Sequence, residues 1–177
     1  MYDALFKVCV FGDGGVGKTS LVNRYLTGLF KSGSIMTIGV DFLMKDLEIQ
    51  GKKVALQIWD FAGEKRFQFL LPGYVRGASA GIFMFDITRM ASLHSLTEWL
   101  DVLKKGTLDE GKSIPIMMVG GKMDLNDRRS VFSIDAKEIA QSHNLLEYIE
   151  CSSKTGENVE LIFNTLAEFL LKKAGKV

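Results

Sequence analysis

Short apolar runs alternate with longer amphipathic segments along most of this chain. Several of the runs are apolar almost throughout, which is typical of strands covered on both faces of a sheet. The runs that we predict to be strands are 5–11, 40–49, 54–60, 81–86, 114–119 and 146–151. Strands that alternate with helices favour a mostly parallel sheet, because parallel neighbours need long crossover connections. The pattern therefore predicts a single α/β domain over residues 1–177.

One connection breaks the parallel pattern. The second and third runs are joined only by the polar segment 50–53, which is too short for a crossover, so they should form an antiparallel hairpin. Segment 29–39 has no clear period, and we interpret it as a long functional loop. Apolar periodicity predicts helices after Lys18 and near 66–75, 92–105, 133–143 and 158–173. We expect a six-stranded, mostly parallel sheet with one antiparallel hairpin strand and about five helices around it.

The composition mainly excludes classes of function. The 22 Lys and Arg nearly balance the 21 Asp and Glu, so the net charge of +1 provides no field that would attract nucleic acid. The two cysteines, Cys9 and Cys151, lie in apolar runs, and we interpret them as buried hydrophobes in a reducing compartment. Met84 also lies in a strand run, where a methionine ordinarily fills gaps in the core.

Membrane signals are weak. No apolar run approaches the roughly 20 residues that a bilayer crossing needs, and the sequence offers neither a leader peptide nor a C-terminal cysteine for prenylation. We expect a cytoplasmic protein, and we leave open both peripheral membrane association and a lipidated tail beyond this sequence.

A phosphate-binding motif follows the first predicted strand. Residues 12–19 read Gly-Asp-Gly-Gly-Val-Gly-Lys-Thr and open a helix, which is the context that a P-loop requires. Glycines let backbone N–H groups turn toward phosphates, Lys18 can reach the outer phosphates, and the Thr19 hydroxyl can ligate Mg²⁺. The predicted phosphate-binding residues are Gly14, Gly15, Val16, Gly17, Lys18, Thr19 and Ser20.

Two further segments suit a metal ion and a third phosphate. Asp60 ends a strand next to the P-loop strand and can hold the metal, while Gly63 can offer its N–H to a γ-phosphate. Thr37 ends the long loop, where its hydroxyl could complete the metal shell when a third phosphate is present. The sequence predicts Thr19, Thr37 and Asp60 as Mg²⁺ ligands.

Base recognition is predicted after the last two strands. Asp124 follows the fifth strand, and a carboxylate there can accept hydrogen bonds from N1–H and N2–H₂ of guanine, which adenine does not supply. The stem of Lys122 can cover one face of the base. Residues Ser152, Ser153 and Lys154 can present backbone N–H groups to its exocyclic oxygen.

Together these motifs resemble the small GTPases of the Ras superfamily, from about residue 5 to the last helix. Segments 38–42, 56–59 and 76–78 are most similar to the Rab branch. The resemblance implies a small G-protein fold of the P-loop NTPase type and a GTP/GDP switch with Mg²⁺. It also implies that Phe30 packs on the guanine edge, and that effectors, exchange factors and GTPase-activating proteins bind switch loops near 31–40 and 63–74.

The sequence departs from the family pattern at three positions. Glu64 stands where the family has a water-positioning Gln, Gly121 replaces the Asn of the base-reading motif, and Phe61 replaces a small hydroxyl residue. An ionised carboxylate only accepts hydrogen bonds and repels phosphate oxygens, so we expect slow intrinsic hydrolysis. A competing hypothesis makes Glu64 a general base. Loss of the Asn amide predicts weaker nucleotide binding, whereas Gly14 keeps room for an arginine from a partner.

We predict a GTP-hydrolysing switch whose catalytic residues are Lys18, Thr37, Gly63 and Glu64. The alternative is a nucleotide-binding interaction module with little or no GTPase activity, which Glu64 and Gly121 favour. A P-loop nucleoside or nucleotide kinase is disfavoured by the hairpin and by the segment 60–63.

Overall fold

The computed structural model describes residues 1–33, 36–108 and 111–177. Within them, six strands form one sheet in the order β2-β3-β1-β4-β5-β6. The hairpin pair β2 and β3 is antiparallel and the other neighbours are parallel, which confirms the predicted sheet. The strands are β1 (Ala4–Phe11), β2 (Val40–Ile49), β3 (Lys52–Phe61), β4 (Ala80–Asp86), β5 (Ile116–Gly121) and β6 (Tyr148–Glu150).

The hairpin turn is tighter than the predicted segment 50–53. Gln50 and Gly51 alone form it, with φ values of 49° and 74°, so Lys52 already pairs with Ile49. Two consecutive positive φ angles give a turn whose twist matches that of the paired strands. The polar pair of lysines therefore belongs to the ladder of β3. The largest other differences are in the last two strands, because β5 runs from Ile116 to Gly121 and β6 covers only 148–150.

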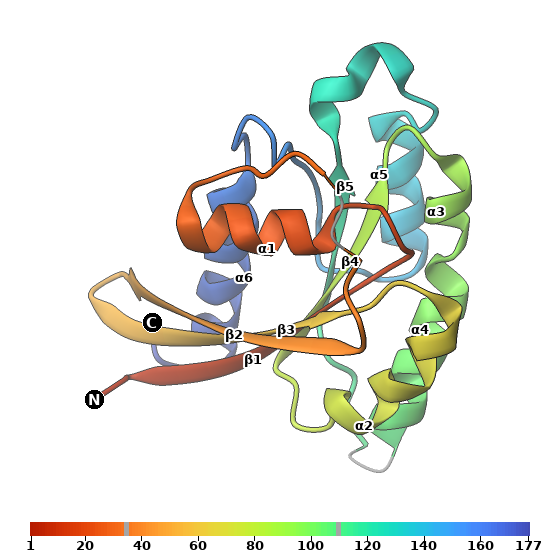
Figure 1. Cartoon of the computed structure of the whole chain (residues 1–177). Coiled ribbons are helices and arrows are strands. Elements are labelled where there is room, and N and C mark those ends of the chain that lie inside the picture. The colour runs from red at the N-terminus through yellow and green to blue at the C-terminus, as the bar shows by residue number, and fades with distance from the viewer. Residues whose placement is uncertain (34–35, 109–110) are drawn as a thin grey trace.

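Helices lie on both faces of the sheet (Figure 1). The predicted helix 92–105 is divided in two at Ser95, and the predicted segment 66–75 begins as a 3₁₀ helix. Within the described residues, no helix has both the length and the apolar character that a membrane crossing requires. The described helices are α1 (Lys18–Thr27), η1 (Lys65–Leu70), α2 (Leu71–Val75), α3 (Met90–His94), α4 (Leu96–Thr107), η3 (Met123–Arg128), α5 (Ser133–Ser142) and α6 (Val159–Lys173).

Two apolar cores lie on opposite faces of the sheet. In β1, Val8 and Val10 pack into the core shared with α1 and α6, whereas Cys9 and Phe11 pack into the core shared with α2, α4 and α5. This alternation follows from the two-residue period of a strand. Cys9 and Cys151 are buried and free, as predicted, and burial raises the pKa of each thiol to about 12. The predicted loop 29–39 includes residues 34 and 35, which lie outside the described residues.

A polar cluster fixes the end of β6. Glu150 accepts hydrogen bonds of 2.6 and 2.9 Å from the Arg129 guanidinium and one of 2.6 Å from the Tyr148 hydroxyl. Burial acts to raise the pKa of Glu150, but the bonds from Arg129 and Tyr148 outweigh it and hold that pKa below its usual value. Residues 151–154 follow directly, so this cluster sets the position of the segment beside the pocket described below.

We predict that Glu150→Gln lowers the free energy of unfolding by about 2 kcal/mol at neutral pH, because a charged acceptor with three donors is lost. A lowered pKa stabilises the fold above the unfolded-state pKa, and this contribution disappears as pH falls through the folded-state value. The difference from the native protein should therefore shrink in acid. Urea unfolding at several pH values measures it, with exposed Glu147→Gln as the control. Equal losses in both variants would contradict the prediction.

Candidate functional site

The loops that follow the parallel strands surround one pocket of about 900 Å³. Parallel strands place their carboxyl ends at the same edge of a sheet, so motifs far apart in sequence meet there. Asp60 and Ser152 lie just behind the lining and are buried. The predicted residues that line the pocket are Gly14, Gly15, Val16, Gly17, Lys18, Thr19, Ser20, Phe30, Thr37, Gly63, Glu64, Lys122, Asp124, Ser153 and Lys154.

The glycine-rich loop bends between β1 and α1. Gly12, Gly15 and Gly17 have φ values of 141°, 73° and 105°, a region that side chains disfavour. Lys18 is 6% exposed, and its Nζ donates to the carbonyl of Asp13 at 2.8 Å. Burial lowers the pKa of Lys18 to about 8, against the opposing effect of the Asp60 and Asp13 carboxylates. A buried ammonium beside a helix N-terminus suits an anionic ligand.

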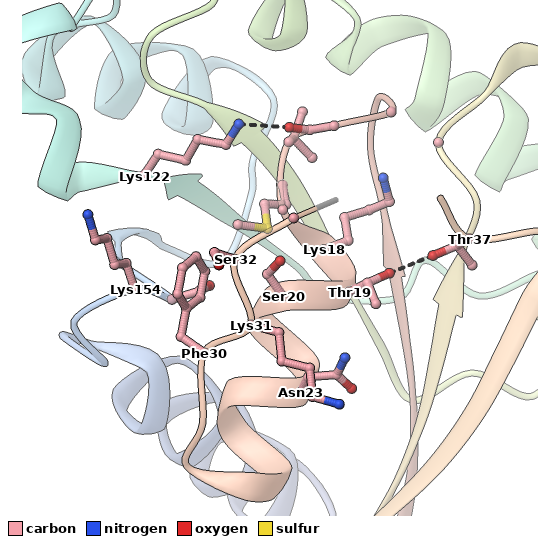
Figure 2. A pocket seen from close by; sticks show the side chains of 18 of the residues that line it. Lys18, Thr19, Ser20, Asn23, Phe30, Lys31, Ser32, Thr37, Lys122 and Lys154 are labelled. Atoms are coloured by element: carbon pink, nitrogen blue, oxygen red, sulfur yellow. Dashed lines mark hydrogen bonds between the residues drawn. The ribbon is translucent and has the colours of Figure 1, made fainter. Parts of the chain in front are cut away.

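Three oxygen-bearing side chains meet beside the loop. The Thr19 hydroxyl donates to Asp60 Oδ2 at 2.6 Å and lies 2.5 Å from the Thr37 hydroxyl (Figure 2). The other carboxylate oxygen, Asp60 Oδ1, is buried without a hydrogen-bond partner among the described residues. Burial raises the pKa of Asp60 to about 6, opposed by the Thr19 hydrogen bond. Hydroxyl and carboxylate oxygens are ligands that Mg²⁺ prefers, so this group fits the predicted metal.

The loop after β5 is tied to the glycine-rich loop. Lys122 Nζ donates to the Gly15 carbonyl at 2.9 Å and pairs with Asp86 Oδ2 at 2.9 Å. Burial acts to raise the pKa of Asp86, but bonds from Thr88 and Lys122 outweigh it and keep that carboxyl below its usual pKa. The Ser152 hydroxyl donates to Asp124 Oδ1 at 2.8 Å. Lys122 is thus held against the glycine-rich loop, and Asp124 is held by the segment after β6.

Glu64 lies beside the glycine-rich loop. A Cβ at Gly14 would lie 4.0 Å from Glu64 Cγ, and Glu64 Oε2 pairs with Arg66 Nε at 2.6 Å. Gly63 approaches even closer, because a Cβ there would overlap backbone atoms of Asp13 and Gly14. Only glycine fits at position 63. Its backbone is therefore held against the loop that is predicted to bind phosphates.

Some residues near the pocket were not found from the sequence. Asp13 accepts hydrogen bonds from the Ser95 hydroxyl at 2.7 Å and from Trp99 Nε1 at 2.9 Å, which ties the glycine-rich loop to α4. Arg89 Nη2 donates to the Gly14 carbonyl at 2.9 Å. No local motif indicates these long-range contacts. Other lining residues outside the predicted set are Asn23, Leu29, Lys31, Ser32, Gly33, Met36, Met84 and Leu125.

An aromatic group lies where β2 and β3 meet the segment 63–74. The Trp59 ring is 4.8 Å from Phe42 and 5.4 Å from Tyr74, measured between centroids. Beneath it, Phe61 is 2% exposed and contacts Tyr74 edge-on at 6.0 Å. Phe61 therefore packs under this segment. Ile38, Met44 and Phe69, which lie in or next to the same segments of the chain, are also exposed.

The sequence of this chain is similar to those of known proteins. The sequence model of the Ras family matches residues 7–172. The chain is 43% identical over 173 residues to the Ras-related protein Rab-30 of Homo sapiens, covering 98% of this chain and 83% of that protein. It is 38% identical to Rab-19 of Mus musculus, with 97% and 77% covered, and 39% identical to Rab-10 of Diplobatis ommata, with 97% and 84% covered.

Proposed function

This chain belongs to the Ras family of small GTPases, in its Rab branch, and we propose that it is a GTP/GDP switch that hydrolyses GTP slowly on its own. The observation that carries the proposal is the pocket itself. A glycine-rich loop, a cluster of hydroxyl and carboxylate oxygens, and a base-reading loop converge there from separate strands. Each part matches one portion of a guanine nucleotide.

The phosphates bind to backbone N–H groups of residues 14–20 and to Lys18 at the start of α1. Thr19, Thr37 and Asp60 are the proposed Mg²⁺ ligands, supported by their convergence and by the unpartnered Asp60 Oδ1. Bound there, Mg²⁺ would neutralise charge on the phosphate oxygens. Thr37 belongs to the loop before β2, so this contact would link the loop's position to the nucleotide state.

The base lies between Phe30 and the stem of Lys122 in this proposal. Asp124 accepts from N1–H and N2–H₂, and backbone N–H groups of residues 152–154 donate to the exocyclic oxygen. The Ser152 hydroxyl bond to Asp124 Oδ1 supports this orientation, because it restrains the carboxylate while leaving further acceptor capacity.

Hydrolysis transfers the γ-phosphoryl group to water. The water oxygen forms a bond to phosphorus and the bond to the bridging oxygen of GDP breaks. One proton of the water stays on its oxygen, and the other passes to another oxygen of the released phosphate. Gly63 N–H and Lys18 stabilise the developing charge. Glu64 lies near this position, but its Oε2 is engaged by Arg66 Nε at 2.6 Å and is therefore not free to take a proton from water. This supports slow intrinsic hydrolysis over a general-base role.

A nucleotide-binding interaction module with little or no GTPase activity is the second candidate, and Glu64 and Gly121 are the observations that favour it. Both candidates use partner proteins that read the switch loops. The aromatic group formed by Phe42, Trp59 and Tyr74 is the proposed docking surface for effectors and regulators. We also propose a cytoplasmic location and leave peripheral membrane association open.

We predict that Glu64→Gln raises the single-turnover rate of phosphate release about tenfold or more, because an amide donates a hydrogen bond that the carboxylate lacks. Exposed Glu138→Gln on α5 is the matched control and should leave the rate unchanged. A slower Glu64→Gln protein would favour the general-base hypothesis. An unchanged rate would remove Glu64 from the reaction, and no phosphate from the native protein over many hours would favour the interaction module.

Substitution of Asp124 tests base selection. Asp124→Asn should weaken GDP binding about 100-fold, because two charge-assisted hydrogen bonds of roughly 1.5 kcal/mol each are lost. ADP binding, weak in the native protein, should not fall further. Competition titrations against a fluorescent guanine nucleotide measure both, with Asp127→Asn in the same loop as the control. Equal competition by ATP and GTP in the native protein would refute Asp124 as the selecting group.

A further inference from the structure

The side chain of Met84 occupies the space next to Gly121 where a larger residue would place its side chain. Gly121 ends β5 and pairs with Asp86, two residues after Met84 on β4. A Cβ added to Gly121 would overlap the terminal methyl of Met84, and it would lie 3.2 Å from the Val16 carbonyl oxygen and 3.4 Å from that of Phe85. The carbonyl groups leave the added carbon little space to move away from the methyl. A larger residue at position 121 therefore requires Met84 to move.

The end of the Met84 side chain occupies the space between two loops. Its methyl lies 3.5 Å from the position of a Cβ on Gly17 in the glycine-rich loop, and it reaches Gly121 at the base-reading loop. Met84 is only 1% exposed, yet it lines the pocket. The expectation that this methionine only fills the core was therefore incomplete. Its thioether takes the volume that a side chain at 121 would use.

Because the Met84 thioether fills the space of a side chain at position 121, the site offers the base different hydrogen-bonding groups there. Guanine presents two donors, N1–H and N2–H₂, and its major-groove edge carries two acceptors, O6 and N7. In the proposed function Asp124 accepts from the donors, and backbone N–H groups of residues 152–154 serve O6. An amide at position 121 could donate to the remaining acceptor, but a thioether has no N–H and glycine has no side chain.

We propose that Met84 and Gly121 together form a specificity-determining pair that makes this site indifferent to N7 of guanine. The inference rests on the proposed function for the orientation of the base. The site then accepts guanine nucleotides whose N7 has been replaced by a C–H group, such as 7-deaza-GDP, as well as it accepts GDP.

An amide at position 121 can reach the base only if Met84 is replaced by a smaller residue as well. Gly121→Asn alone pushes the Met84 methyl toward the pocket, so this variant binds GDP more weakly than the native protein. Met84→Val removes the methyl and sulfur and makes room, so the double variant can place its amide against the base. The backbone of Gly121 lies outside the left-handed region and accepts Asn without strain. The two substitutions are therefore non-additive, as expected for residues in contact.

The test measures competition of GDP and 7-deaza-GDP against a fluorescent guanine nucleotide in four proteins: native, Gly121→Asn, Met84→Val and the double variant. Diphosphates are used because the protein does not hydrolyse them, so hydrolysis cannot change the measured dissociation constants. Because the ratio of the two dissociation constants is taken within each protein, partial loss of folded chain lowers both signals alike. Met84→Val alone is the control for the smaller core side chain.

The ratio should stay within about twofold of one for the native protein and for Met84→Val. The double variant should prefer GDP about fivefold, which corresponds to one net hydrogen bond of about 1 kcal/mol. A fivefold preference for GDP in the native protein would overturn the proposal, as would a ratio near one in the double variant or tighter GDP binding by Gly121→Asn alone. Native protein that binds neither nucleotide would refute the proposed function itself.

Discussion

The close approach of two backbones, at Gly63 and at residues 13–14, is the constraint on which the rest of the pocket depends. No side chain fits at position 63 against the glycine-rich loop. Because Gly63 follows β3 and the loop follows β1, their contact requires these strands to be parallel neighbours, as they are. The same arrangement brings Asp60 to the Thr19 hydroxyl at 2.6 Å. The parallel order of the sheet is therefore what lets one pocket combine motifs from both strands.

Much of this arrangement could be predicted from local patterns. Continuous apolar runs indicated the parallel strands, and a strand followed by Gly-rich residues, Lys18 and Thr19 indicated the loop that lines the pocket. Asp60 and Asp124 could be placed because Asp60 ends a predicted strand, Asp124 follows another, and parallel strand ends meet at one edge. The buried state of Cys9 and Cys151 also followed from their apolar neighbours. In each case the chain neighbours of a residue carried enough information to place it.

Features that depend on contacts between distant segments could not be predicted. The polar Lys52 and Lys53 resembled turn residues, but the positive φ angles of Gln50 and Gly51 place them in β3. The sequence shows Met84 only as a methionine in a strand, whereas the structure places its methyl between Gly17 and Gly121. The bond from Trp99 to Asp13 joins residues 86 positions apart, and no short motif encodes it. Sequence patterns therefore located the chemical groups but not the packing that restrains them.

The attachment of Asp13 to Ser95 and Trp99 has a thermodynamic consequence for α4. This helix also packs against α2, which follows the segment that carries Glu64. A ligand that displaced α4 would disturb the glycine-rich loop and the α2 segment together. Coupling between two binding sites is reciprocal. A partner protein that favours one position of α4 would therefore change the affinity for the nucleotide by a certain factor, and the nucleotide would change the affinity for that partner by the same factor. A surface on α4, beside the switch segment 63–74 but outside it, would then report the nucleotide state.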